Sequence, residues 1–155
     1  MMARMRTARG FSILEIAIVM AIAGVLIAIT VPRLQGYIEK NRVATAIVEI
    51  GEMSTKIRQY EVSKAMLPDT LADAGYGGRL DPWSQPYEYV NLRTSPASVK
   101  ARKDKNLKPL NSDYDLYSIG PDGLTAASLN NAKSRDDIIR ARDGAFIGTA
   151  EEFDP

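Results

Sequence analysis

The chain has 155 residues, a net charge of +1, and neither cysteine nor histidine. The lack of cysteine excludes disulfides, thiol catalysis and thiolate metal sites, and the lack of histidine removes the commonest general base and zinc ligand. A net charge near zero provides no electrostatic footprint for nucleic acid, so we expect no nucleic-acid partner. Beyond its N-terminal segments, the chain is long enough for one modest domain.

The first ten residues form a short basic leader. Arg4, Arg6 and Arg9 carry three positive charges with no acid among them. Under the positive-inside rule this end stays in the cytoplasm while the rest of the chain crosses the membrane. A secretory signal peptide also begins this way, but it requires small residues at a cleavage site after the apolar run. Residues 31–34, VPRL, do not provide one.

An uncharged apolar stretch runs from Ile16 to Pro32. Its length is about that needed for a helix to span a bilayer, so we expect one membrane helix. Glu15 lies at the mouth of this stretch, where an ionised acid costs roughly 2.5 to 3.5 kcal/mol on insertion scales. Either Glu15 is an ordinary boundary acid at headgroup level, or it has a partner.

The helix is predicted to continue beyond the membrane, from Phe11 to about Lys64. Pro32 lacks an amide donor and should kink or locally unwind it. Beyond Pro32, apolar residues recur at three- and four-residue steps, which indicates an amphipathic helix whose stripe packs as core. These residues are Val43, Ile47, Ile50, Met53, Ile57 and Tyr60.

The sequence pattern of the remaining chain is typical of short strands and turns. Residues 69–78 are expected to form a loop with a helical turn, and residues 80–90 a proline-braced turn that leads into a strand. A second strand is predicted at residues 114–119 and a third at 145–147. We expect an α+β fold in which the long N-terminal helix packs on a small antiparallel sheet. The lysine- and arginine-rich residues 93–111 are interpreted as a solvated loop.

The segment RGFSILE, followed at once by the apolar run, resembles the N-terminal signature of type IV pilins and pseudopilins. The resemblance implies that a prepilin peptidase cuts after Gly10 and methylates the new N-terminal amine of Phe11. It also implies that Glu15 compensates this amine on a neighbouring subunit of a filament. The implied segments are a leader at 1–10, a membrane and filament-core helix at 11–32, and a periplasmic domain at 33–155.

The blocks DPWSQPYEY, YDLYSIGPDG and DDI resemble the major pseudopilin of the type II secretion system, with Ser84 in place of the usual glycine. In that family the loop after the strand holds calcium, so the resemblance implies a C-terminal metal-binding loop with Asp122, Asp136 and Asp137 as Ca²⁺ ligands. Ca²⁺ prefers such oxygen donors. The alternative is an ordinary turn at Asp122, together with a capping box in which Ser134 caps a short helix.

The resemblance implies a structural function, with no catalytic residues. The chain would be the repeating subunit of a periplasmic pseudopilus, a homo-oligomeric helical filament anchored in the inner membrane. Its partners would be the prepilin peptidase, minor pseudopilins, the assembly platform and an outer-membrane secretin. A type IV pilin for adhesion, twitching or DNA uptake is the alternative. An enzyme built on Asp136 and Asp137 is disfavoured because no nucleophile or oxyanion motif accompanies them.

Overall fold

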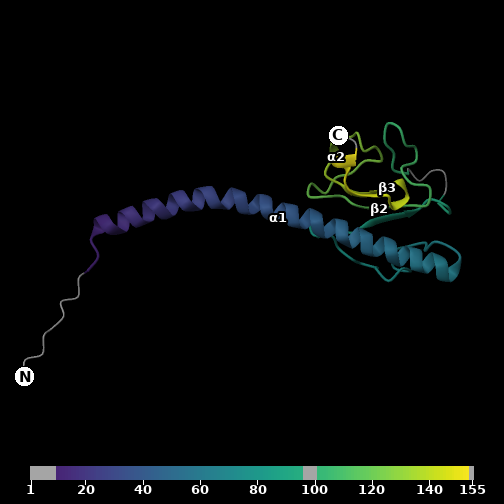
Figure 1. Ribbon diagram of the computed structural model, residues 1–155, viewed down its shortest axis with the longest axis horizontal. Helices are drawn as coiled ribbons and strands as arrows, with labels where there is room; N and C mark the ends of the chain where they lie inside the picture. Colours follow the sequence, from purple (N-terminus) through teal and green to yellow (C-terminus); the bar gives the residue numbers. More distant parts are fainter. Residues whose placement is uncertain (1–9, 96–100, 154–155) are drawn as a thin grey trace, which may run out of the picture. The chain divides into compact units, whose positions relative to one another are not determined.

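A long helix, α1 (Ile13–Lys64), dominates the fold of the computed structural model, which describes residues 10–95 and 101–153 (Figure 1). It begins two residues after the predicted start and ends at the predicted residue. The helix continues through Pro32, so the expected local unwinding is absent. Proline removes only one backbone hydrogen bond, and apolar helices tolerate that loss. The chain divides into two compact parts, residues 1–39 and 40–155.

The first part contains the apolar half of α1, and its side chains are uncovered. Ile13, Leu14 and Val19 are largely exposed, and the other large apolar side chains up to Ile38 are also exposed. Among the described residues, α1 is the one helix long and apolar enough to cross a membrane. A helix that is apolar on all sides requires lipid or other helices around it. The arginines of the leader lie outside the described residues.

The second part has its main core between α1 and a sheet. The helix contributes Ala46, Ile50, Met53 and Ile57, all buried, with Val43 and Ile47 packed beside them. Their steps of three and four residues confirm the predicted stripe, although its last member, Tyr60, remains half-buried. The facing side chains of this core are Tyr87, Tyr114, Leu116 and Ile138.

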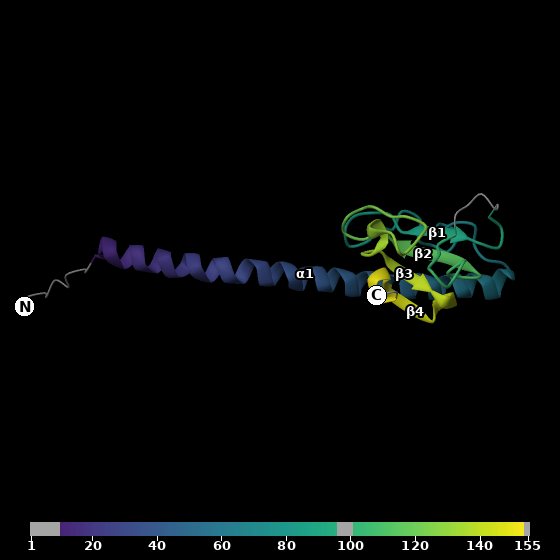
Figure 2. The ribbon, with the colours of Figure 1, turned by 90° about the horizontal axis from the view of Figure 1, so that it is seen from above.

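The sheet has four antiparallel strands in the order β1-β2-β3-β4, side by side in Figure 2. They are β1 (Glu88–Asn91), β2 (Tyr114–Ser118), β3 (Ile138–Ala141) and β4 (Phe146–Thr149). Short helices lie at η1 (Ala132–Ser134), η2 (Arg142–Gly144) and α2 (Ala150–Phe153). The predicted α+β fold is confirmed, and β1, β2 and β4 correspond to the three predicted strands.

Strand β3 was not predicted, because its four residues are all buried and show no alternation of apolar and polar positions. The sequence had suggested a capped helix here, and that alternative is wrong. The Ser134 hydroxyl bonds to the amide and carbonyl of Ala126, at 2.8 and 3.0 Å, instead of capping a following helix. Asn131 caps η1 instead.

A second core contains Leu110, Leu129, Ile139, Ala141 and Ala150. Since Ile138 belongs to the first core and Ile139 to the second, the sheet is covered on both faces. Residues 101–111 contribute to the second core through Leu110 and also bury Arg102. The interpretation of this segment as a solvated loop is therefore wrong for Arg102 and Leu110, whereas Lys103, Lys105 and Lys108 are exposed as expected.

Candidate functional site

The predicted cleavage and assembly residues lie at the start of α1. Gly10 is exposed, and a β-carbon built on it would meet no atom within 4 Å. Phe11 is 82% exposed. Phe11 and Glu15 line a shallow apolar groove together with Ile16, Val19 and Met20. The structure thus places the predicted processing site on accessible backbone, one turn before Glu15.

Glu15 takes part in a capping box that the sequence analysis missed. Its Oε2 accepts a hydrogen bond from the Ser12 amide at 3.1 Å, and its own amide donates to Ser12 Oγ at 3.2 Å. The signal was available in the sequence, since Ser-x-x-Glu before an apolar run is typical of a helix N-terminus. A carboxylate has about four acceptor positions, so the cap leaves Glu15 able to accept further hydrogen bonds.

The DPWSQP block forms a turn organised by the buried carboxylate of Asp81. Its Oδ1 accepts the amides of Trp83 and Gln85, at 2.9 and 2.8 Å, and its Oδ2 accepts the Ser118 hydroxyl at 2.5 Å. Ser84 has a φ of +67°, a conformation that favours glycine. The block therefore has a structural role, in which it ties the turn before β1 to the end of β2.

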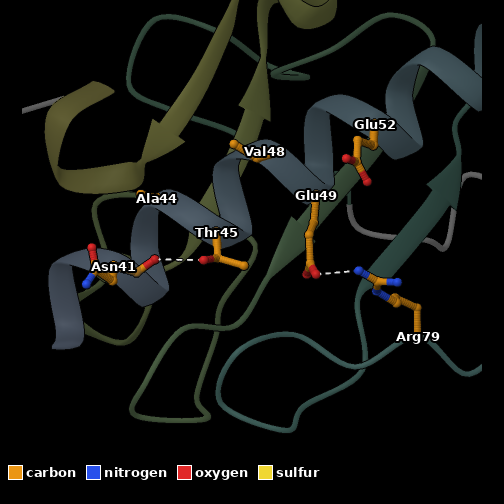
Figure 3. A pocket seen from close by; sticks show the side chains of 7 residues that line it. All are labelled: Asn41, Ala44, Thr45, Val48, Glu49, Glu52 and Arg79. Atoms are coloured by element: carbon orange, nitrogen blue, oxygen red, sulfur yellow. Dashed lines mark hydrogen bonds and ion pairs between the residues drawn. The ribbon is translucent and has the colours of Figure 1, made fainter.

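A shallow groove runs along α1 in the second part of the chain (Figure 3). Glu49 closes one side of it, with an ion pair to Arg79 at 2.5 Å and a hydrogen bond from the Tyr87 hydroxyl at 2.6 Å. Burial raises the pKa of Tyr87, so this hydroxyl keeps its proton and donates. These contacts fasten the loop before β1 to the helix. The lining residues are Asn41, Ala44, Thr45, Val48, Glu49, Glu52 and Arg79.

Two of the three predicted calcium ligands lie together. The Asp122 amide donates to Asp136 Oδ2 at 3.1 Å, while Asp122 Oδ1 accepts the Leu124 amide at 2.7 Å. Burial raises the pKa of Asp136, and the nearby charge of Asp122 adds to the rise. Gly120 brings the turn close, because a β-carbon there would lie 2.5 Å from the Asp136 carbonyl oxygen.

The third predicted ligand, Asp137, has different partners. It is fully buried, and its Oδ2 accepts bonds from Arg102 Nη2 at 2.5 Å and from Thr125 Oγ1 at 2.7 Å. Burial raises the pKa of Asp137 to about 6, and the Arg102 guanidinium limits the rise. Arg102 and Thr125 gave no signal in the sequence, because charged and hydroxyl side chains in a polar segment are usually solvated.

These contacts do not fit one calcium ion held by all three carboxylates. Over residues 10–95 and 101–153, no three Asp, Glu, His or Cys side chains are grouped so that they could hold a metal ion. Asp136 and Asp137 are neighbours in the chain, but one contacts Asp122 and the other contacts a guanidinium. Calcium binding stays a prediction for direct measurement.

Comparison with known proteins shows to which family this chain belongs. No protein-family model matches the chain, and no solved structure matches it. The type II secretion system core protein G of Escherichia coli K12 is 32% identical over 136 residues, which cover 74% of this chain and 83% of the relative. That of Pseudomonas aeruginosa is 26% identical over 148 residues, covering 82% and 93%.

A fimbrial protein is also similar. The type IV major fimbrial protein FimA of Dichelobacter nodosus is 43% identical over 129 residues, covering 80% of this chain and 72% of the relative. Each of these matches covers about three quarters or more of this chain. The chain therefore belongs to the type IV pilin-like superfamily, in the group that includes the type II secretion system core protein G.

Proposed function

We propose that this chain is the repeating structural subunit of a periplasmic pseudopilus that drives type II protein secretion through an outer-membrane secretin. The observation that carries the proposal is the uncovered apolar half of α1, which begins with an acid in its first turn. Similarity to core protein G over most of the chain supports it. The type IV pilin alternative is less favoured, because several core protein G sequences match and the chain has no cysteine to close its C-terminal region.

Filament assembly would provide both a cover for the apolar side chains of α1 and a partner for the charge of Glu15. Packing against the helices of neighbouring subunits would cover the apolar side chains, and the amine of a neighbour's Phe11 would compensate the charge of Glu15. An uncompensated charge in an apolar bundle is strongly unfavourable, so Glu15 would favour subunits inserted in the correct register. The function is mechanical, and no catalysis is proposed. Asp136 and Asp137 engage different partners and do not form an acid–base pair.

The proposed orientation is based on the basic residues of the leader. Its arginines would stay in the cytoplasm, where a prepilin peptidase would cut after Gly10 and methylate Phe11. Residues 33–155 would face the periplasm. Before assembly the subunit is a single-pass protein of the inner membrane, and its partners are the assembly platform, minor pseudopilins and the secretin.

Glu15→Val tests the assembly role directly. The variant should be processed and inserted normally, because it removes a charge from the membrane segment, yet it should not enter filaments. Sheared or cross-linked filaments, quantified from cells that express the full chain with its secretion machinery, give the readout.

Ser12→Ala is the matched control, since it removes the capping hydroxyl and keeps the carboxylate. It should weaken the first helical turn by about 1 kcal/mol and leave filament formation intact. Normal filament yield from Glu15→Val would refute an intersubunit role. Equal losses in both variants would assign the role of Glu15 to its own capping box.

Processing can be followed in the same cells. Gly10→Leu should leave an uncut precursor in the inner membrane, because glycine allows the closest approach of a protease to the backbone. Mass spectrometry of the wild-type protein should find a methylated Phe11 at the N-terminus. An N-terminus beyond Pro32 would contradict the proposed processing.

A further inference from the structure

Arg102 is a buried cation in the loop between β1 and β2. It is 3% exposed, and its guanidinium has three neighbours from separate segments. Nη2 bonds to Asp137 Oδ2 at 2.5 Å, Nη1 bonds to Thr125 Oγ1 at 2.8 Å, and the group lies 4.1 Å from the centroid of the Tyr117 ring. The backbone amide of Arg102 also donates to Asp115 Oδ2 at 2.7 Å. Arg102 is therefore positioned by both its main chain and its side chain.

Arg102, Asp137 and Thr125 form a closed triangle of hydrogen bonds, because Thr125 Oγ1 also donates to Asp137 Oδ2 at 2.7 Å. The triangle connects the loop after β1, the loop after β2 and the residue before β3. A buried carboxylate must be compensated by an opposite charge, and a guanidinium keeps its positive charge throughout the physiological pH range. The pair holds together the part of the chain that the calcium hypothesis assigned to a metal ion.

The guanidinium also opposes a metal ion at the same carboxylate. Two cations in contact with one buried carboxylate repel each other across only a few ångströms, where screening by water is weak. Asp122 and Asp136 contact each other, and among the described residues no third carboxylate is grouped with them. At the Asp137 carboxylate, the arrangement of side chains thus favours the Arg102 guanidinium over a metal ion.

We infer that the guanidinium of Arg102 is the permanent counter-ion of Asp137 and holds the loop between β2 and β3 closed without a divalent cation. Subunit stability is then independent of the calcium concentration around the protein. The inference concerns the folded domain and does not rest on the proposed filament function.

Asp137 Oδ1 is the atom on which the inference depends. It is buried and accepts no hydrogen bond within the described residues. If a divalent cation binds this carboxylate after all, it does so through Oδ1. A calcium titration of the wild-type protein therefore tests the inference without any substitution.

The experiment uses the full chain in detergent micelles and follows thermal unfolding through the fluorescence of Trp83, the single tryptophan. The melting temperature should be the same in millimolar CaCl₂, in MgCl₂ and in EDTA. Calorimetric titration with CaCl₂ should give no saturable heat. A calcium-dependent rise of several degrees that EDTA reverses would overturn the inference.

Substitutions test the pair itself. Arg102→Met keeps most of the side-chain volume and leaves Asp137 without its cation, so its melting temperature should fall by about 10 °C or more. Lys103→Met is the matched control, since it removes a cation from the exposed neighbouring position and should change little. The double variant Arg102→Met, Asp137→Leu should recover part of the loss, because no buried charge remains.

If Arg102→Met does not fold, the wild-type titration and the double variant still decide the question. Equal losses in Arg102→Met and Lys103→Met would show that the guanidinium has no special role. A double variant as unstable as the sum of the single variants would contradict a direct pair.

Discussion

Asp81 gives the most direct test of how the DPWSQP block stabilises the domain. Asp81→Ala removes one carboxylate that accepts three hydrogen bonds, from the amides of Trp83 and Gln85 and from the hydroxyl of Ser118. Ser118 is fully buried, so its hydroxyl donor cannot turn to water when the carboxylate is lost. The two amides belong to partly exposed residues and can regain hydration.

The expected loss of stability in Asp81→Ala follows from the different exposure of these three donors. A hydrogen bond to a charged group contributes about 1.5 to 3 kcal/mol, and rehydration of the two amides reduces their share. We expect Asp81→Ala to lower the free energy of unfolding by about 3 kcal/mol. For a domain of about 100 residues this corresponds to a fall in melting temperature of about 10 to 20 °C.

The assay is thermal unfolding of the full chain in detergent, followed by the fluorescence of Trp83. Asp81→Asn is the control, because its amide oxygen can still accept the two backbone amides while its NH₂ group donates to Ser118 Oγ. It should lose only about 1 kcal/mol. A melting temperature of Asp81→Ala within 2 °C or so of the wild type would refute the argument that this carboxylate organises the turn.

Three further predictions concern the same domain. Ser84→Gly should raise the melting temperature by a few degrees. Serine in this left-handed conformation costs about 1 kcal/mol or more of strain, and removing that strain outweighs the larger conformational entropy that glycine loses on folding. Gly120→Ala should lower it, because the new β-carbon would lie 2.5 Å from a carbonyl oxygen, and the same sign for both changes would contradict the reasoning. Hydrogen bonds from the amide and hydroxyl of Ser112 hold the pKa of Asp143 below its usual 3.8. This stabilisation is complete above the unfolded-state pKa and is lost as the pH falls through the folded-state value, so Asp143→Asn should differ from the wild type more at pH 7 than near about pH 2 in urea unfolding. A difference that does not change with pH would contradict it.

Local sequence signals predicted the long helix and its two halves. The uncharged run after Glu15 and the stripe of Ile50, Met53 and Ile57 each have a period or a composition that a single segment reveals. The start of the helix is also local, since Ser12 and Glu15 form the capping box that their spacing indicates. Strands β1, β2 and β4 were predicted because alternation or turn residues mark them.

The structure decided what depends on distant segments. Strand β3 is buried on both faces, so its sequence shows no alternation, and only the layers on its two sides make it a central strand. In the alternative to the calcium site Ser134 would cap a helix, but the loop at Ala126 lies within reach of its hydroxyl.

Arg102 is the clearest case. Within its own segment it is one of several basic residues, and it becomes a buried counter-ion only because Asp137, 35 residues away, is brought beside it. Helix periodicity and turn chemistry act over a few residues, and the sequence alone therefore determined them. Charge compensation in a core depends on which segments the fold brings together, and tertiary structure alone decides that.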